Sequence, residues 1–448
     1  MKKKYVSTTN ACKMCTPMGA CLAFRGIEGA MPFLHGSQGC STYMRRYIIS
    51  HFREPIDIAS SSLGEKHAIY GGGPNLKQGI RNVISKYHPS LIGIGTTCLT
   101  ETIGDNVPMF ISEYKREFPQ LDMPVLVPVS TPSYSGTHVD GFHNAVKAVV
   151  ETLAQAGPRG ESLNLLPGFV SPEDLRYLKE IFEDFKIDAT ILPDISESLD
   201  GPALDMYEKI PCGGTPLAAI SAMGRAKATV EFGRTLHPDK TAGASLKKRF
   251  NIPLFNTGLP VGVRETDRFF EILQNASGKP VPRKYALERG RLIDSYVDGH
   301  KYVFEKRAVV YGEEDLVVGI TAFLMEIGVL PIRCASGGKS GRFKKAIEQA
   351  TPEVTEDTLI YEGVDFMDIA EEVERLNPDI LIGHSKGFHI ARKMNIPLVR
   401  VGFPIHDRIG GHRLLHLGYR GTQQLFDRIV NAILEKKQQD SGIGYFYM

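Results

Sequence analysis

Short apolar runs recur along the chain, and each is followed by a turn and then by a segment with helical spacing. Residues 90–95 form such a run, residues 99–118 are mainly helical in pattern, and residues 124–129 form the next apolar run. This order is typical of the βαβ unit of an open parallel sheet. Ligands of such sheets lie beyond the carboxyl ends of the strands, where Cys98 and residues 130–134 are expected.

Two further sets of the same pattern follow. In the second set, Ser171, Pro172 and Asp174 match a capping box with proline at the first helical position. Residues 228–232 are ambiguous between strand and helix, and a long polar helix over residues 282–305 separates the second set from the third. The other apolar runs of these two sets are residues 163–166, 189–192, 253–256, 308–311, 329–333, 379–383 and 396–404.

The last two of these runs echo residues 90–132 in order: an apolar strand ending in glycine, a helix, and a strand led by proline. We interpret this as a weak internal repeat of doubly wound units. The pattern predicts an α/β protein of three Rossmann-like, doubly wound parallel-sheet domains. We expect these domains near residues 1–158, 159–300 and 301–448.

Four of the seven cysteines fall within the first forty residues. Cys15 and Cys40 flank an amphipathic stretch bounded by glycines, and Gly36 and Gly39 precede Cys40 closely. Thiolates are the ligands that iron–sulfur clusters need. Glycine beside a cysteine lets backbone N–H groups approach cluster sulfides. We therefore interpret the two cysteine-containing turns as half of a binding site for an iron–sulfur cluster.

Other interpretations of these cysteines remain open. Cys12 and Cys15 have the spacing of a zinc or redox pair, but a second such pair is missing and only polar residues 7–10 precede them. Buried structural thiols are the other alternative, because a free cysteine packs as a small hydrophobe. The sequence leaves the role of Cys12 and of Cys21 undecided.

Cys98 is the third candidate ligand, after Cys15 and Cys40. Three thiolates from three turns of one domain underfill a cubane cluster, which takes four cysteines. The missing ligands suggest a partner chain and a cluster at the interface between subunits.

Composition narrows the class of protein. The chain has 448 residues, 42% of them hydrophobic and 23% charged, which is ordinary for a globular protein of two or three domains. A net charge of +2 gives no electrostatic case for nucleic acid, and no apolar run approaches the ~20 residues that span a bilayer. The basic start lacks an apolar h-region, and the odd cysteine count fits a reducing compartment, so we expect a cytoplasmic protein.

The remaining motifs give little support for other chemistry. No complete dinucleotide or P-loop fingerprint is present, since residues 337–341 lack the first glycine of a P-loop. His412 and His416 have a metal-chelating spacing, but the flanking glycines favour satisfied polar roles. Cys212 and Cys334 stand alone, and we expect them to be structural.

Six segments together resemble the β-type subunits of the nitrogenase component 1 superfamily. They are residues 15–20, 35–40, 51–55, 96–105, 131–138 and 402–408. The resemblance covers essentially the whole chain and implies three Rossmann-like domains with an α-type partner.

In catalytic members of this superfamily, Cys15, Cys40 and Cys98 match the β-side ligands of the 8Fe–7S P-cluster. Ser133 resembles the serine that binds this cluster when it is oxidised. The resemblance also implies an α2β2 heterotetramer with an E-type or D-type partner, and transient docking of an ATP-dependent iron protein. The large cofactor is held by the partner, so the resemblance assigns no catalytic residue to this chain.

Within the superfamily, the chain resembles most the N-type scaffold subunit (NifN), whose complex matures the iron–molybdenum cofactor precursor. It starts a few residues before its first cysteine and ends soon after residues 418–422. Many such scaffold subunits keep only the cysteine that matches Cys40, with a 4Fe–4S cluster completed by the partner. All three cysteines are present here, which keeps open the β subunit of a nitrogenase or of a methylthio-alkane reductase.

Overall fold

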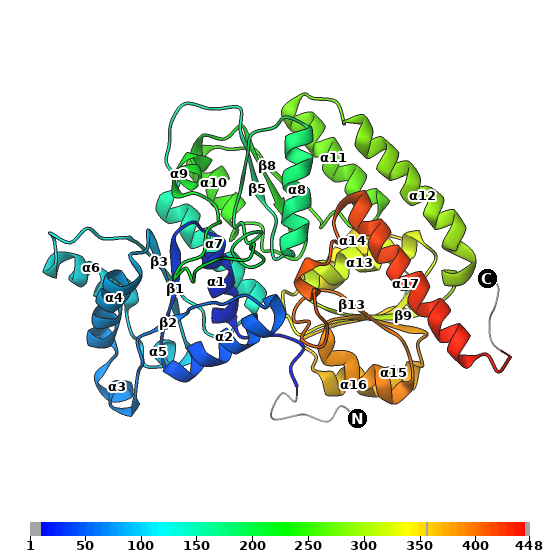
Figure 1. Cartoon of the computed structure of the whole chain (residues 1–448), viewed down its shortest axis with the longest axis horizontal. Coiled ribbons are helices and arrows are strands. Elements are labelled where there is room, and N and C mark those ends of the chain that lie inside the picture. Colours follow the sequence, from blue (N-terminus) through cyan, green and yellow to red (C-terminus); the bar gives the residue numbers. More distant parts are fainter. Residues whose placement is uncertain (1–9, 355–356, 444–448) are drawn as a thin grey trace.

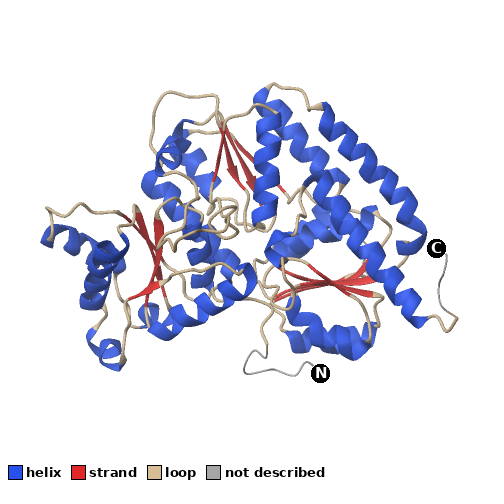
Figure 2. Ribbon diagram, viewed as in Figure 1, coloured by secondary structure: helices blue, strands red, loops and turns tan. Residues whose placement is uncertain are grey.

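Three parallel sheets, each covered by helices, make up the chain (Figures 1 and 2). The computed structural model describes residues 10–354 and 357–443. The strand orders are β2-β1-β3-β4, β6-β5-β7-β8 and β11-β10-β9-β12-β13, and all strand pairs within them are parallel. The predicted α/β class is thereby confirmed. The domain boundaries near residues 158 and 300 stay a prediction.

The first sheet and its helices carry the predicted thiol ligands. Its elements are α1 (Thr16–Arg25), β1 (Ala30–His35), α2 (Gln38–Phe52), β2 (Ala59–Ser60), α3 (Glu65–Tyr70), α4 (Gly73–Tyr87), β3 (Leu91–Thr96), α5 (Cys98–Thr102), α6 (Val107–Glu117), β4 (Val125–Val129) and α7 (His138–Leu153).

Both central strands of this sheet are buried on both faces, as parallel strands covered by helices are. On one face, Phe33 and Ile94 pack in a cluster with α4 and α6, and on the other Leu34 belongs to the core of α1 and α7. Every residue of α1 is buried, so the predicted amphipathic stretch is wrong for this helix. It is enclosed because it packs against α7 as well as the sheet.

The second sheet also follows the predicted pattern. Its elements are β5 (Leu163–Leu166), α8 (Pro172–Asp184), β6 (Ala189–Ile191), α9 (Leu217–Ala222), the 3-10 helix η1 (Met223–Arg225), β7 (Ala228–Phe232), α10 (Ala242–Phe250), β8 (Leu254–Thr257), α11 (Val263–Ser277) and α12 (Arg283–Val303). The ambiguous residues 228–232 form a fully buried strand.

The third sheet is the largest. Its elements are β9 (Arg307–Gly312), α13 (Glu314–Glu326), β10 (Leu330–Ser336), α14 (Phe343–Ala350), β11 (Leu359–Glu362), α15 (Phe366–Leu376), β12 (Ile380–Gly383), η2 (Ser385–Gly387), α16 (Phe388–Met394), β13 (Leu398–Arg400), η3 (Gly411–Arg413) and α17 (Gly418–Asp440). The last helix, α17, packs along α12, which precedes this sheet in the chain (Figure 1). Among the described residues, no helix is long and apolar enough to cross a membrane.

The predicted cap of α8 is confirmed and gives a first stability prediction. The Ser171 hydroxyl accepts a hydrogen bond from the N–H of Asp174 at 3.0 Å and donates one to the carbonyl of Leu414 at 2.7 Å. We expect Ser171→Ala to lower the free energy of unfolding by about 1 kcal/mol, the usual cost of losing such a cap. Urea unfolding would measure it. Ser171→Thr keeps a capping hydroxyl and serves as the control; equal losses in both variants would contradict the assignment.

Candidate metal-cluster site

The three predicted ligand cysteines meet at one edge of the first sheet. Cys40 lies in the first turn of α2, directly after β1, and Cys98 opens α5, directly after the neighbouring strand β3. Cys15 precedes α1, and its thiol lies close enough to the thiols of Cys40 and Cys98 to interact with both electrostatically. All three are free and partly exposed. The structure therefore brings the predicted ligands together.

Each of these cysteines lies at the amino-terminal end of a different helix. Cys15 is the N-cap of α1, Cys40 is the third residue of α2, and Cys98 is the first residue of α5. The positive end of a helix dipole favours negative charge and stabilises a thiolate. The three candidate ligands therefore share one position, the start of a helix.

Ser133 connects two of the three cysteines. Its hydroxyl accepts a hydrogen bond from the N–H of Thr16 at 3.2 Å and is also hydrogen-bonded to the Cys15 thiol. Its own N–H donates to the Cys98 sulfur at 3.3 Å. A serine oxygen is thus present at the same edge as the thiols.

The Cys15 thiol shows how charge is balanced at this edge. Burial raises its pKa, the Ser133 hydroxyl lowers it, and the neighbouring thiols of Cys98 and Cys40 raise it, so the net shift is upward. Without a metal this thiol keeps its proton at neutral pH. Metal binding would therefore release protons from the site.

Hydrogen bonds hold the ends of the neighbouring strands in register around the thiols. Thr131, just after β4, donates from its N–H to the Thr96 hydroxyl at 2.8 Å and from its own hydroxyl to the Thr96 carbonyl at 2.7 Å. The N–H of Thr97 donates to the carbonyl of His35 at 3.1 Å. The carboxyl ends of β1, β3 and β4 are therefore fixed relative to one another.

The two glycines before Cys40 have different roles. A Cβ at Gly39 would meet only the Ser37 hydroxyl, at 3.9 Å, so open space lies beside the cysteine as the cluster-binding hypothesis expects. A Cβ at Gly36 would come within 2.2–2.8 Å of the Thr97 side chain. Gly36 therefore serves close packing of two strand ends, which the sequence analysis did not foresee.

A crossing of α1 and α7 positions Cys15 and was missed by sequence reasoning. A Cβ at Gly19 would lie 1.6 Å from the carbonyl oxygen of His138, and one at Gly141 would lie 1.9 Å from that of Thr16. The two helices approach this closely only because both positions are glycine. The spacing of Gly19 and Gly141 in the sequence gives no signal that these helices touch.

The other cysteines lie apart from this edge. Cys21 and Cys334 are buried, and Cys334 lies 3.2 Å from the Thr321 hydroxyl, as expected of structural thiols. The structural expectation is wrong for Cys212, which is exposed and donates to the Glu208 carboxylate at 3.5 Å. Cys12 is buried 3.8 Å from His384, beside a different cavity.

Of the two histidines predicted to have satisfied polar roles, His412 has partners for both ring nitrogens, whereas Nε2 of His416 has no hydrogen-bond partner in the described part of the chain. His412 lies 3.0 Å from the Asp200 carboxylate, and His416 lies 3.3 Å from the Asp174 carboxylate. The first belongs to η3 and the second to the following loop, so they do not share a helix face.

His51, at the end of α2, gives a prediction on acid stability. Its Nδ1 accepts the N–H of Ile405 at 2.9 Å, and burial, together with the nearby His412, lowers its pKa to about 3. Below about pH 6.5 the histidine takes up a proton in the unfolded chain but not in the folded one. Its contribution to the free energy of unfolding is therefore complete above that pH and falls by about 1.4 kcal/mol per pH unit as the pH drops toward 3. Urea unfolding at about pH 7.5 and 5.5 would measure this slope. We expect a smaller slope in His51→Gln, and equal slopes would contradict the assignment.

Within residues 10–354 and 357–443, no group of three or more His, Cys, Asp or Glu side chains could hold one metal ion. The partial exposure of all three thiols leaves one side of the edge open to ligands from outside the chain.

Fold and site together define an α/β protein of three parallel-sheet units with a three-thiol edge on the first. The family model described as nitrogenase component 1 type oxidoreductase matches residues 15–434. The chain belongs to this family and is of the β-chain type.

Two similar relatives are nitrogenase molybdenum-iron protein beta chains. That of Clostridium pasteurianum is 36% identical over 96% of this chain and 94% of its own length, and that of Methanothermobacter thermautotrophicus is 37% identical over 97% and 96%. The vanadium-iron protein beta chain of Trichormus variabilis is 34% identical over 96% and 95%.

A solved structure entitled nitrogenase Cp1 at pH 6.5 has the same fold over the whole chain. It superposes with a TM-score of 0.96 at 34% identity and covers 100% of this chain and 98% of the other.

Proposed function

We propose that this chain is the β subunit of a component 1 type heteromer and that Cys15, Cys40 and Cys98 bind an iron–sulfur cluster at the subunit interface. The observation that carries this proposal is the convergence of three partly exposed thiols from three helix ends at one sheet edge. The thiols underfill a cluster, so a partner of α type completes it. The presence of all three favours an 8Fe–7S P-cluster type over a 4Fe–4S cluster.

The chain's own residues hold and adjust this cluster. Metal binding would displace the thiol protons, which leave to solvent through the exposed side of the edge. The Ser133 hydroxyl, already bonded to the Cys15 thiol, lies where it could bind iron when the cluster is oxidised. When bound, the cluster supplies a relay of electrons between a reductase and a larger cofactor in the partner.

The partners follow from the same proposal. Relatives named as molybdenum-iron and vanadium-iron protein beta chains support an α2β2 heterotetramer with a D-type or E-type α subunit. An ATP-dependent iron protein would dock transiently and deliver electrons. All seven cysteines are free, which supports a cytoplasmic location.

Two forms of this function are to be distinguished. The first is the catalytic β subunit of a nitrogenase or of a related reductase such as a methylthio-alkane reductase. The second is the scaffold subunit of NifN type that matures the iron–molybdenum cofactor. From the sequence alone, the short chain indicates the scaffold form. This chain covers 94% of the Clostridium pasteurianum beta chain and 86% of the Azotobacter vinelandii beta chain, so chain length does not separate the two forms. The retained cysteines therefore weigh toward the catalytic form.

Turnover by the purified heteromer tests which form is right. The heteromer, prepared anaerobically, would be assayed with its iron protein, ATP and a reductant on acetylene, dinitrogen and a methylthio-alkane. Sustained product formation would support the catalytic form. Absence of product, combined with transfer of matured cofactor to a cofactor-free nitrogenase, would overturn it in favour of the scaffold.

A further inference from the structure

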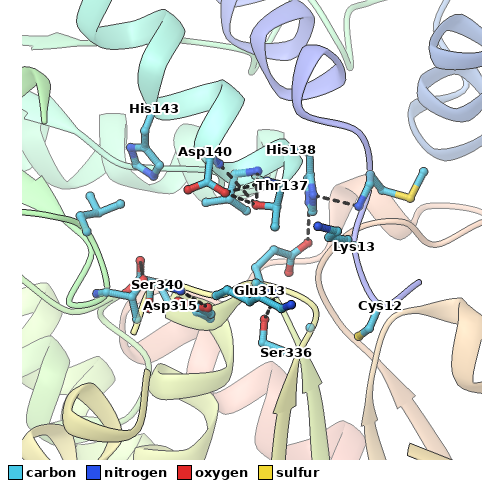
Figure 3. A pocket seen from close by; sticks show the side chains of 18 of the residues that line it. Cys12, Lys13, Thr137, His138, Asp140, His143, Glu313, Asp315, Ser336 and Ser340 are labelled. Carbon is cyan, nitrogen blue, oxygen red and sulfur yellow. Dashed lines mark hydrogen bonds and ion pairs between the residues drawn. The ribbon is translucent and has the colours of Figure 1, made fainter. Parts of the chain in front are cut away.

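A cavity of about 240 Å³, separate from the thiol edge, lies where the carboxyl ends of the three sheets meet (Figure 3). One wall is the start of α7, with Thr137 and His143, and another is the segment after β7 that contains Lys240. The remaining wall comes from turns that follow β9, β10 and β12 in the third sheet. Parallel α/β sheets bind ligands at such strand ends. Cys15, Cys40 and Cys98 do not line this cavity.

The carboxylates on its walls are occupied by the protein itself. Asp315 accepts the N–H groups of Arg234 and Thr235 at 2.7 and 3.0 Å. Asp140 closes the cap of α7, and Glu313 lies 3.3 Å from the His138 ring (Figure 3). The fourth carboxylate, that of Glu314, accepts a hydrogen bond from the N–H of Ser340, and burial raises its pKa to about 7. These acids bind the walls together and are engaged before any ligand enters.

The cations on the walls keep unused donors. The side chains of Lys240 and Lys339 make no hydrogen bond or ion pair with any residue that the structure describes, and the Arg342 guanidinium uses only Nη1, which donates to the carbonyl of Leu236 at 2.8 Å. Lys13 and Lys386 each donate one hydrogen bond to a backbone carbonyl. Five cations thus face one cavity without a carboxylate partner among the described residues.

A buried histidine adds an independent observation. His384 is 3% exposed, lines the cavity, and has an Nδ1 atom without a hydrogen-bond partner in the described part of the chain. Its Nε2 lies 3.8 Å from the Cys12 sulfur, and burial raises the pKa of that thiol to about 12. The Nδ1 atom is therefore a buried polar atom for which the described residues supply no partner. A buried polar atom of this kind calls for a hydrogen-bond partner.

The glycine loop at residues 337–341 does not act as a phosphate loop. The N–H groups of Gly338, Ser340 and Gly341 donate to Ser336, Glu314 and Glu362. The loop instead presents Lys339 and leads to Arg342 at the cavity. Side-chain cations, rather than backbone amides, are the available groups for an anion.

We propose that this cavity binds a small anion with two or more negative charges, carried by phosphate or carboxylate groups. Lys240, Lys339 and Arg342 would bind its charges, because charge-assisted hydrogen bonds to such groups are the strong ones. A cavity of about 240 Å³ has room for a small anion such as a diphosphate or a tricarboxylate.

Isothermal titration calorimetry of the purified heteromer with pyrophosphate and with tricarballylate tests this proposal. We expect one site per β chain, and the preferred probe tells whether phosphate or carboxylate is the group recognised. Lys339→Gln combined with Arg342→Gln should weaken binding at least about tenfold through the loss of two charged donors. Lys344→Gln, an exposed lysine of α14 outside the cavity, is the matched control and should bind like the wild type.

Two results would overturn the proposal. One is no binding of either probe up to about 10 mM, a range that covers even weak sites. The other is equal affinity in the double variant and the wild type. Iron content, measured in the same preparations, should be unchanged in all variants, which separates this test from that of the cluster site.

Discussion

Replacing Cys40 with alanine is expected to remove most of the iron from the purified heteromer and to weaken its association. The Cys40 thiol lies in the first turn of α2, at the edge where the thiols of Cys15 and Cys98 also lie. Thiolate–iron bonds would join this edge to the partner, so loss of one ligand affects both metal and assembly. Metal analysis and size-exclusion chromatography of anaerobic preparations would measure the two effects.

Cys212→Ala is the matched control, because that thiol is exposed and is not part of the edge. It should keep wild-type iron and assembly. Unchanged iron in the Cys40→Ala heteromer would refute the ligand assignment.

The second large effect is expected at the crossing of α1 and α7. In Gly19→Ala the new methyl group would lie 1.6 Å from the His138 carbonyl oxygen, so the two helices must separate. Overpacking of this kind costs about 1–3 kcal/mol or more, because backbone rather than a flexible side chain must move. Since α1 carries Cys15 at its start and Ser133 precedes α7, we also expect reduced iron binding. Thermal unfolding and iron content would measure both effects.

Gly290→Ala provides the control for this substitution. Gly290 is also within a helix, but a Cβ there meets nothing within 4 Å. That variant should be unchanged or more stable by up to about 1 kcal/mol, since alanine is the better helix former. A Gly19→Ala protein that melts like the wild type and keeps its iron would contradict the proposed role of the crossing.

The sequence was sufficient for most of the strands and for placing Cys98 beside Ser133, for one physical reason. The carboxyl ends of parallel strands share an edge, so residues following the predicted strands β3 and β4 were expected to be neighbours. The strand β1, which precedes Cys40, was not predicted, because its residues were read as part of an amphipathic stretch. The cap of α8 was equally local, because Ser171 and Asp174 are three residues apart.

Features that depend on long-range packing could not be predicted in this way. Gly19 and Gly141 meet only because two helices from the ends of the first sheet unit cross. The return of α17 onto α12 is likewise a matter of tertiary packing. Local periodicity describes which face of a helix is apolar but not which helix covers it.

The cavity between the three sheets could not be predicted from the sequence either. The contact between His138 and Glu313 joins residues 175 positions apart, and the cavity walls come from all three sheets. The segment from Cys12 to Cys15 connects the two sites, because Cys12 lines the cavity and Cys15 belongs to the thiol edge. Cys12 and Cys15, the first cysteine pair in the sequence, thus belong to two different sites and do not form one metal-binding pair.

The central claim is that this chain and an α-type partner share an iron–sulfur cluster bound by Cys15, Cys40 and Cys98. Mössbauer spectroscopy of the anaerobically purified, iron-enriched heteromer tests it most directly, with the wild type compared to a variant in which all three cysteines are replaced by alanine. We predict the signals of thiolate-bound cluster iron in the wild type and the loss of the interfacial cluster's signals in the variant. The same cluster signals in both preparations, or no cluster iron in the wild type, would contradict the account.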